Sequence, residues 1–191
     1  GKKILDIGCG DGTMGKALKE KGAIVFGTDI SKNAVEKATH VLDKAFVLDV
    51  DGGDLSIVDG DFDVIIASEV IEHLFAPKNF LINVKGRMKK DSVLILTTPN
   101  FLMWTNRIKM FFGKFEYTET GFLDEGHIHF FTYDSFCSRR CGTVLQGFVL
   151  GGHSFFDLFV SRFHHFGSHV NDVCSASCSK KFWRKKSIRR F

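Results

Sequence analysis

The sequence has no hydrophobic run that approaches the roughly 20 residues needed for a membrane-spanning helix. A secretory signal peptide is also absent, and the chain starts inside an apolar strand pattern without Met, so we expect upstream sequence to have been lost or removed. Cysteine is scarce: the five present form no tight framework, which argues against a disulfide-stapled scaffold and favours a reducing compartment. We therefore predict a cytoplasmic protein, and 191 residues suffice for one domain with a real core.

Two pairs of cysteines have metal-like spacing. Cys137 and Cys141, and Cys174 and Cys178, are each four positions apart, and four thiolates could hold zinc. Because the spacing is not the usual C-x₂-C, we predict no zinc site.

Acidic residues are missing from residues 180–191 (KKFWRKKSIRRF), which hold seven Lys or Arg. The rest of the chain has 19 basic and 22 acidic residues, so the net charge of +4 belongs to this tail. A solvated, disordered end is the simplest interpretation, and a patch for anionic lipid or nucleic acid is the alternative. We do not expect a nucleic-acid partner.

A glycine-rich stretch, ILDIGCGDGTMG, occupies residues 4–15. It predicts a buried strand over Lys3–Ile7, a loop, and a helix over Thr13–Lys21. Such a loop lets a ligand approach the main chain and the helix N-terminus. The third glycine of the dinucleotide fingerprint G-x-G-x-x-G is lacking, since Thr13 stands there. Asp6, two residues before Gly8, suits a ligand with an ammonium group. A tight turn without a ligand is the alternative.

Asp29 follows a second predicted strand, residues 23–28, and lies 19 residues after Gly10. A carboxylate about 20 residues past such a loop binds ribose hydroxyls in nucleotide-binding α/β folds. The alternative is that Asp29 caps a helix. Ser31 is the expected cap of the next helix, which should run from Lys32 to about His40.

Four motifs in order, ILDIGCGDG, GTDIS, FDVIIASEVIEHL and VLILTTPN, resemble those of class I S-adenosylmethionine-dependent methyltransferases over roughly residues 1–150. The resemblance implies a doubly wound, mostly parallel Rossmann-like α/β sheet with helices on both faces. It implies that Asp6, Gly8 and Gly10 line the methionine end of S-adenosylmethionine and that Asp29 holds the ribose. Asp49 would approach the adenine amino group, and Ser68 and Glu69 would border the methyl-transfer cleft. The remaining members of this predicted cofactor set are Cys9, Ile30 and Val50.

The resemblance divides the chain into a methyltransferase domain, residues 1–152, and a C-terminal extension, residues 153–191. Within the domain, residues 1–98 form the cofactor half and residues 99–132 the acceptor-side insertions. The first 100 residues contain five of the 21 phenylalanines and the last 91 contain sixteen, which indicates either an acceptor pocket or ordinary core.

The second half is expected to begin with a helix over residues 70–86, interrupted near Pro77, and a fifth strand over residues 92–98. Residues 101–115 mix Phe, Met and Trp with Arg and Lys. They predict a covering helix, with an amphipathic lid or a peripheral membrane contact as alternatives. A helix over residues 133–141 and a sixth strand over residues 144–150 should follow; no seventh strand can be placed.

Two histidine-bearing segments could carry chemistry. Glu69, Glu72 and His73 would share one helix face, and His127 could join them around a divalent cation. This pattern resembles metal-dependent O-methyltransferases acting on small-RNA 3′ ends or ubiquinone precursors. Because E-H-L also occurs widely in metal-free relatives, we predict no metal. The alternatives are that His73 bonds backbone at a helix start and that His127 anchors a loop.

Residues 97–136 (TTPNF to TYDSF) resemble methyltransferases associated with bacterial surface-polysaccharide biosynthesis and, more weakly, methionine-biosynthesis W-type proteins. The first resemblance implies O-methylation of a sugar or other small hydroxyl acceptor, and the second an accessory protein that regulates a partner enzyme. A metal-dependent RNA-end methyltransferase is a third possibility. Histidine has a pKa near neutrality, so His127, and after it His73, are the predicted general bases. We expect residues 68–73, 98–104, 114–120 and 126–131 to meet over the carboxyl edge of the sheet.

Overall fold

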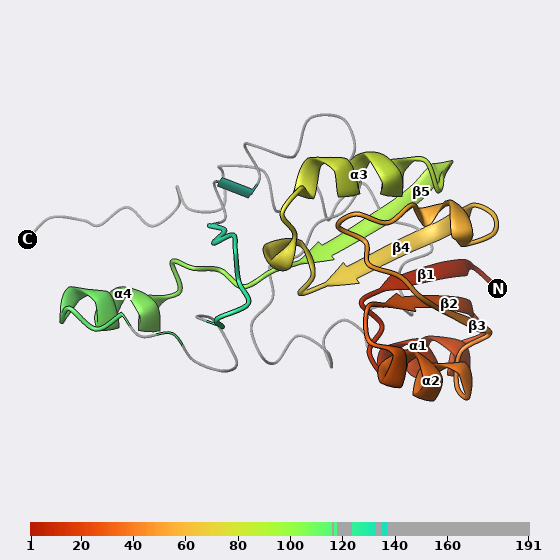
Figure 1. The fold of residues 1–191 in the computed structure, drawn as a ribbon, viewed down its shortest axis with the longest axis horizontal. Coiled ribbons are helices and arrows are strands. Elements are labelled where there is room, and N and C mark those ends of the chain that lie inside the picture. Colours follow the sequence, from red (N-terminus) through yellow and green to blue (C-terminus); the bar gives the residue numbers. More distant parts are fainter. Residues whose placement is uncertain (116, 118–123, 133–134, 137–191) are drawn as a thin grey trace, which may run out of the picture.

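The computed structural model describes residues 1–115, 117, 124–132 and 135–136. Five parallel strands form one sheet in the order β3-β2-β1-β4-β5 (Figure 1). The strands are β1 (Lys3–Ile7), β2 (Ile24–Asp29), β3 (Lys44–Val47), β4 (Phe62–Ser68) and β5 (Met88–Thr97). The chain runs outward from β1 to β3, then crosses over to β4 and β5. The order therefore reverses between β1 and β4, where open α/β sheets bind ligands.

Helices cover both faces of the sheet. Helices α1 (Thr13–Glu20) and α2 (Lys32–Thr39) pack on one face, where Leu18 and Ala38 join the core. Helix α3 (Pro77–Lys85) packs on the other face through Phe80 and Val84. Burial drives this arrangement, because β1 and β4 are buried on both sides and, apart from Asp6, their buried residues are apolar, as in strands of a covered parallel sheet. The predicted doubly wound α/β fold is confirmed.

The predicted helix over residues 70–86 is wrong in its first part. A single 3₁₀ turn, η2 (Ile71–His73), stands apart from α3, and a second short turn, η1 (Leu55–Ile57), precedes β4. Pro77 is the cause, since it restricts the residue before it and begins helices well. Ala76 accordingly leaves helical geometry, with φ −121° and ψ 63°.

Other boundaries differ by a few residues. Strand β5 begins at Met88, four residues earlier than expected, because Met88 pairs with Phe62 across an irregularity in the β4–β5 register. Ser31 caps α2 as predicted, since its side chain accepts a hydrogen bond from the N–H of Ala34.

Helix α4 (Trp104–Phe111) lies beyond the carboxyl edge of the sheet, apart from the helices that cover its faces (Figure 1). It is shorter than the segment from which it was predicted. Within the described part of the chain, no helix has the length and apolar content to cross a membrane. The predictions for residues 137–191, including the sixth strand and the four paired cysteines, lie outside the described residues.

Candidate functional site

The glycine loop after β1 has the backbone shape that its sequence predicts. Gly8, Gly10 and Gly12 have positive φ values of 72°, 55° and 84°. A Cβ added at Gly8 would lie 2.6 Å from the Val70 side chain, whereas one at Gly10 would meet nothing within 4 Å. Gly8 is therefore required by packing, and Gly10 faces open space that a ligand can enter.

Asp6 is fully buried beneath this loop. Neither of its carboxylate oxygens has a hydrogen-bond partner among the described residues. Burial, and after it the negative charge of Asp29, raises the pKa of Asp6 from 3.8 to about 7. A buried carboxyl without a partner is unfavourable, so the position suits a cationic ligand group that would favour the ionised form.

Asp29 ends β2 and contacts the loop directly. Its two carboxylate oxygens accept hydrogen bonds from the N–H groups of Gly10 and Ser31, each 2.9 Å long. Asp29 therefore shapes the loop, a role that sequence spacing alone did not reveal. Each oxygen keeps a second acceptor direction for a ligand hydroxyl. Cys9, which is part of the loop, is buried, and Ile30, which follows Asp29, is exposed.

Asp49 and Val50 follow β3 on the same sheet edge. Asp49 is exposed and accepts a hydrogen bond from the N–H of Asp51. Val50 packs in part against the core, and the N–H of Leu48 donates to the carbonyl of Asp29. This bond joins the end of β3 to the end of β2, so the predicted adenine and ribose residues are neighbours.

Glu69 occupies a strained turn directly after Ser68, the last residue of β4. Its φ is 54°, which makes it the one non-glycine residue in the described part with positive φ. The Thr97 hydroxyl donates to the Glu69 carboxylate over 2.9 Å and accepts from its N–H. The prediction that Glu69 shares a helix face with Glu72 and His73 is therefore wrong, since β5 holds Glu69 in a turn.

Glu72, His73 and His127 nevertheless come together. Atoms able to ligate a metal, one from each residue, all lie within 4.8 Å of one another. The imidazole rings of His73 and His127 are 4.7 Å apart, and His127 Nε2 is 4.0 Å from Glu72 Oε1. The sequence predicted no role for Glu72 other than that of a metal ligand. Its burial, and with it the charge of Glu69, raises its pKa from 4.5 to about 8.

The segment carrying His127 is fastened to η2 by main-chain bonds. The N–H groups of Ile128 and His129 both donate to the Glu72 carbonyl over 2.9 Å. His73 Nδ1 lies 2.9 Å from the carbonyl oxygen of Gly126. Since a carbonyl only accepts, Nδ1 is the donor in this bond, and in the neutral imidazole the lone pair then belongs to Nε2 of His73.

Aromatic rings continue from His127 toward α4. Phe130 lies 6.4 Å from His127 and 5.1 Å from Phe101 between ring centroids. Phe115 and Tyr117 extend this group. The predicted meeting of four segments is thus seen for the described residues of each. Phe131, next to Phe130, does not belong to this group, because it is a core residue packed against Phe136.

The chain is similar to known methyltransferases. A family model described as a methyltransferase domain matches residues 1–139. The chain is 33% identical over 104 residues to a ubiquinone biosynthesis O-methyltransferase of Coxiella burnetii, covering 52% of this chain and 44% of that one. It is 37% identical over 107 residues to the mitochondrial ubiquinone biosynthesis O-methyltransferase of Schizosaccharomyces pombe, with coverages of 51% and 38%. The chain thus spans less than half the length of these curated relatives.

Solved structures are also similar. A TehB-like SAM-dependent methyltransferase from Corynebacterium glutamicum matches with a TM-score of 0.46 and 28% identity, covering 50% of this chain and 54% of that one. A S-adenosylmethionine-dependent methyltransferase from Mesorhizobium loti matches with a TM-score of 0.48 and 22% identity, with coverages of 52% and 48%.

Proposed function

Because the chain belongs to the family of methyltransferase domains, whose model matches residues 1–139, we propose that it transfers a methyl group from S-adenosylmethionine to a hydroxyl of a sugar or another small acceptor. The cofactor supplies a methyl group activated on a sulfonium sulfur. Two features support its fit here: the unpartnered carboxyl of Asp6 suits the ammonium of the methionine end, and Gly10 leaves open space. In this proposal Asp29 would offer acceptors to the ribose hydroxyls, and Asp49 would approach the adenine.

The observation that carries the proposal is the position of the histidine cluster beside the glycine loop. Val70 packs against Gly8, and Glu72 and His73 follow within three residues. An acceptor bound against His127 would therefore lie next to the ligand of the loop. Holding two reactants in line supplies much of the rate increase of such a transfer.

In this proposal His127 receives the acceptor proton as the oxygen forms its new bond to the methyl carbon. His127 has the side-chain type suited to proton transfer near neutral pH. His73 is a positioning residue, because its Nδ1–H donates to the carbonyl of Gly126, the residue directly before His127. The Glu72 carbonyl fixes the other side of the same segment.

The acceptor class is proposed from the aromatic rings near His127. Phe101, Tyr117 and Phe130 offer flat apolar surfaces, which suit the C–H face of a sugar. The resemblance of residues 97–136 to polysaccharide-associated methyltransferases supports a glycan. The ubiquinone biosynthesis relatives make a phenolic hydroxyl the main competitor.

A second candidate is the same transfer assisted by a divalent cation. The three-residue cluster favours it, since two imidazoles and one carboxylate form a common transition-metal ligand set. A bound cation would offset the free-energy cost of burying the ionised carboxylate of Glu72. Against it, Glu69, the other acid of the ligand set predicted from sequence, is held by Thr97.

The proposal is tested in two steps with the full chain. Calorimetry with S-adenosylmethionine, its demethylated product and NAD should give binding of the first two only; tighter NAD binding would overturn the cofactor assignment. Methyl transfer from radiolabelled cofactor is then measured on nucleotide sugars, glycosides and catechols. Labelled sugars support the proposed acceptor, and labelled catechols alone would show that the acceptor is phenolic. Cofactor binding without transfer to any acceptor would favour an accessory role.

A further inference from the structure

Helix α4 turns its apolar side away from the protein. Trp104, Ile108 and Phe111, at positions i, i+4 and i+7, are 67%, 49% and 85% exposed, and Phe112 after the helix is 71% exposed. On the other side Asn106 is buried and donates to the carbonyl of Phe101. A helix on a globular protein normally does the reverse, with its apolar stripe inward. The exposed stripe therefore needs a partner.

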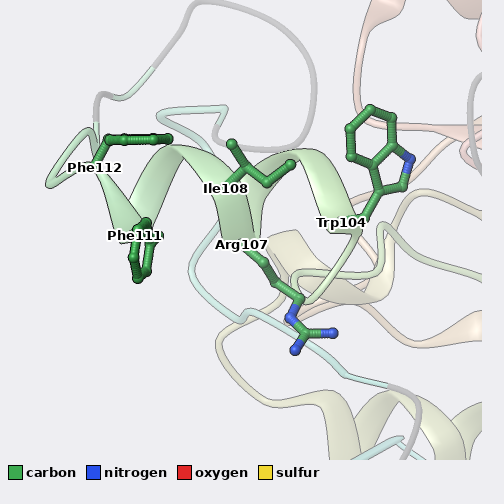
Figure 2. Close-up of a pocket in the computed structure, with 5 residues that line it drawn as sticks. All are labelled: Trp104, Arg107, Ile108, Phe111 and Phe112. Atoms are coloured by element: carbon green, nitrogen blue, oxygen red, sulfur yellow. The ribbon is translucent and has the colours of Figure 1, made fainter. Parts of the chain in front are cut away.

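The charged residues of the segment that carries this stripe, residues 101–115, all have one sign. Residues 101–115 contain Arg107, Lys109 and Lys114, all exposed, and no Asp or Glu. Arg107 lines the same hollow as Trp104, Ile108, Phe111 and Phe112 (Figure 2). Aromatic and aliphatic side chains flanked by basic groups are the composition of helices that lie in the interface of anionic membranes. Tryptophan in particular favours that boundary.

The place of α4 in the fold distinguishes between partners. It protrudes beyond the carboxyl edge of the sheet (Figure 1), so a surface that approaches from this edge can meet α4 before it meets the sheet and the helices α1, α2 and α3. A second copy of this chain would bring three positive charges against three more, which is unfavourable. A negatively charged surface has the matching sign.

From these observations we propose that α4 docks this chain on an anionic lipid bilayer. Trp104, Ile108, Phe111 and Phe112 enter the boundary between head groups and acyl chains, and Arg107, Lys109 and Lys114 contact lipid phosphates. This surface is independent of the proposed methyl transfer, because none of these residues belongs to the cofactor or histidine sites.

The test uses the full chain and sedimentation with phosphatidylcholine vesicles, with or without phosphatidylglycerol. Binding to the anionic vesicles should be at least about tenfold tighter and should weaken at high salt. The double change Trp104→Ser with Phe111→Ser should reduce binding at least about tenfold, as should Arg107→Glu with Lys109→Glu. The matched controls are Ile82→Ser and Lys78→Glu on α3, both exposed, which should bind like the unaltered chain.

Tryptophan fluorescence gives a second reading. In a Trp183→Phe background Trp104 is the one remaining tryptophan, and its emission should shift to the blue when anionic vesicles are added. If binding to anionic vesicles survives both α4 double changes, the proposal is overturned and lipid contact is assigned to residues 180–191, which both double variants retain unchanged. The proposal would also be overturned if Trp104 emission were blue-shifted without vesicles and the chain were a dimer that Phe111→Ser dissociates. In that case α4 would be a subunit interface.

Discussion

The carboxylate Oδ2 of Asp29 accepts a hydrogen bond of 2.9 Å from the main-chain N–H of Gly10, although the two residues lie on different strand–loop connections. One side chain thus shapes the loop and faces the predicted ribose position. We expect Asp29→Ala to weaken S-adenosylmethionine binding by about 1.5–3 kcal/mol, the range for losing charged hydrogen bonds. Calorimetry measures this. Asp54→Ala is the matched control, since Asp54 also accepts two bonds but caps η1. Unchanged affinity in Asp29→Ala would remove Asp29 from the cofactor site.

Gly8→Ala should mainly affect stability, whereas Gly10→Ala should mainly affect cofactor binding. Gly8→Ala combines positive φ with a clash against Val70, so it should lower the free energy of unfolding by about 2–4 kcal/mol. Gly10→Ala has open space and should cost only about 1 kcal/mol of stability, while the new methyl group occupies space meant for the cofactor.

Gly22→Ala is the control for Gly10→Ala. Gly22 also has positive φ, 84°, and nothing within 4 Å of an added Cβ, but it lies after α1, at the amino end of β2. Urea unfolding should show similar losses for both variants, and calorimetry should show weaker cofactor binding for Gly10→Ala alone. Equal cofactor binding in the two would contradict a ligand at Gly10.

Much of the cofactor half could be predicted because its signals are local. The positive φ of Gly8 and the Ser31 cap follow from residues adjacent in sequence. Glu69 shows where this fails: its turn depends on Thr97, 28 residues away, and a helical spacing rule could not anticipate that bond. The contact of His73 with Gly126 spans 53 residues, so only the packed fold reveals which side of the His127 segment it holds.

Stability should depend on pH through Asp6. Its pKa is 3.8 when unfolded and about 7 when folded, so between these values the unfolded chain releases a proton that the folded chain keeps. Stability present below pH 3.8 is therefore lost as pH rises to about 7. In Asp6→Asn the free energy of unfolding should fall less over this pH range, by on the order of 2–4 kcal/mol, because the amide does not titrate. Urea unfolding across this range measures it, with exposed Asp61→Asn as control. Equal slopes for Asp6→Asn and the unaltered chain would refute the role of burial.

Chelation separates the two candidate mechanisms. We expect methyl transfer to persist after treatment with a chelator, because His127 alone can receive the proton and Glu69, the remaining nearby acid, is bonded to Thr97. Elemental analysis of the purified protein should find no stoichiometric metal. Loss of activity on chelation, restored by Mn²⁺ or Mg²⁺ and abolished by Glu72→Gln, would establish the cation-assisted reaction instead.

The histidine pair should separate proton transfer from positioning. His127→Ala should lower methyl transfer by about 10²-fold or more, the range for losing a general base, and leave cofactor affinity within about threefold. His73→Ala should lower turnover less, because it removes only the bond to the Gly126 carbonyl. His73→Asn, whose amide can donate to the same carbonyl, should restore part of that loss.

The pH dependence of turnover then identifies the base. If His127 receives the proton, kcat should fall at acidic pH with an apparent pKa that His73→Asn leaves in place, and the fall should vanish in His127→Ala. His129→Ala is the control on the same segment, since the His129 ring contacts Phe131 rather than His73. Full turnover in His127→Ala would reject it as base. If His73→Ala abolishes turnover and His73→Asn does not restore it, the general base is His73, whose Nε2 lone pair is available.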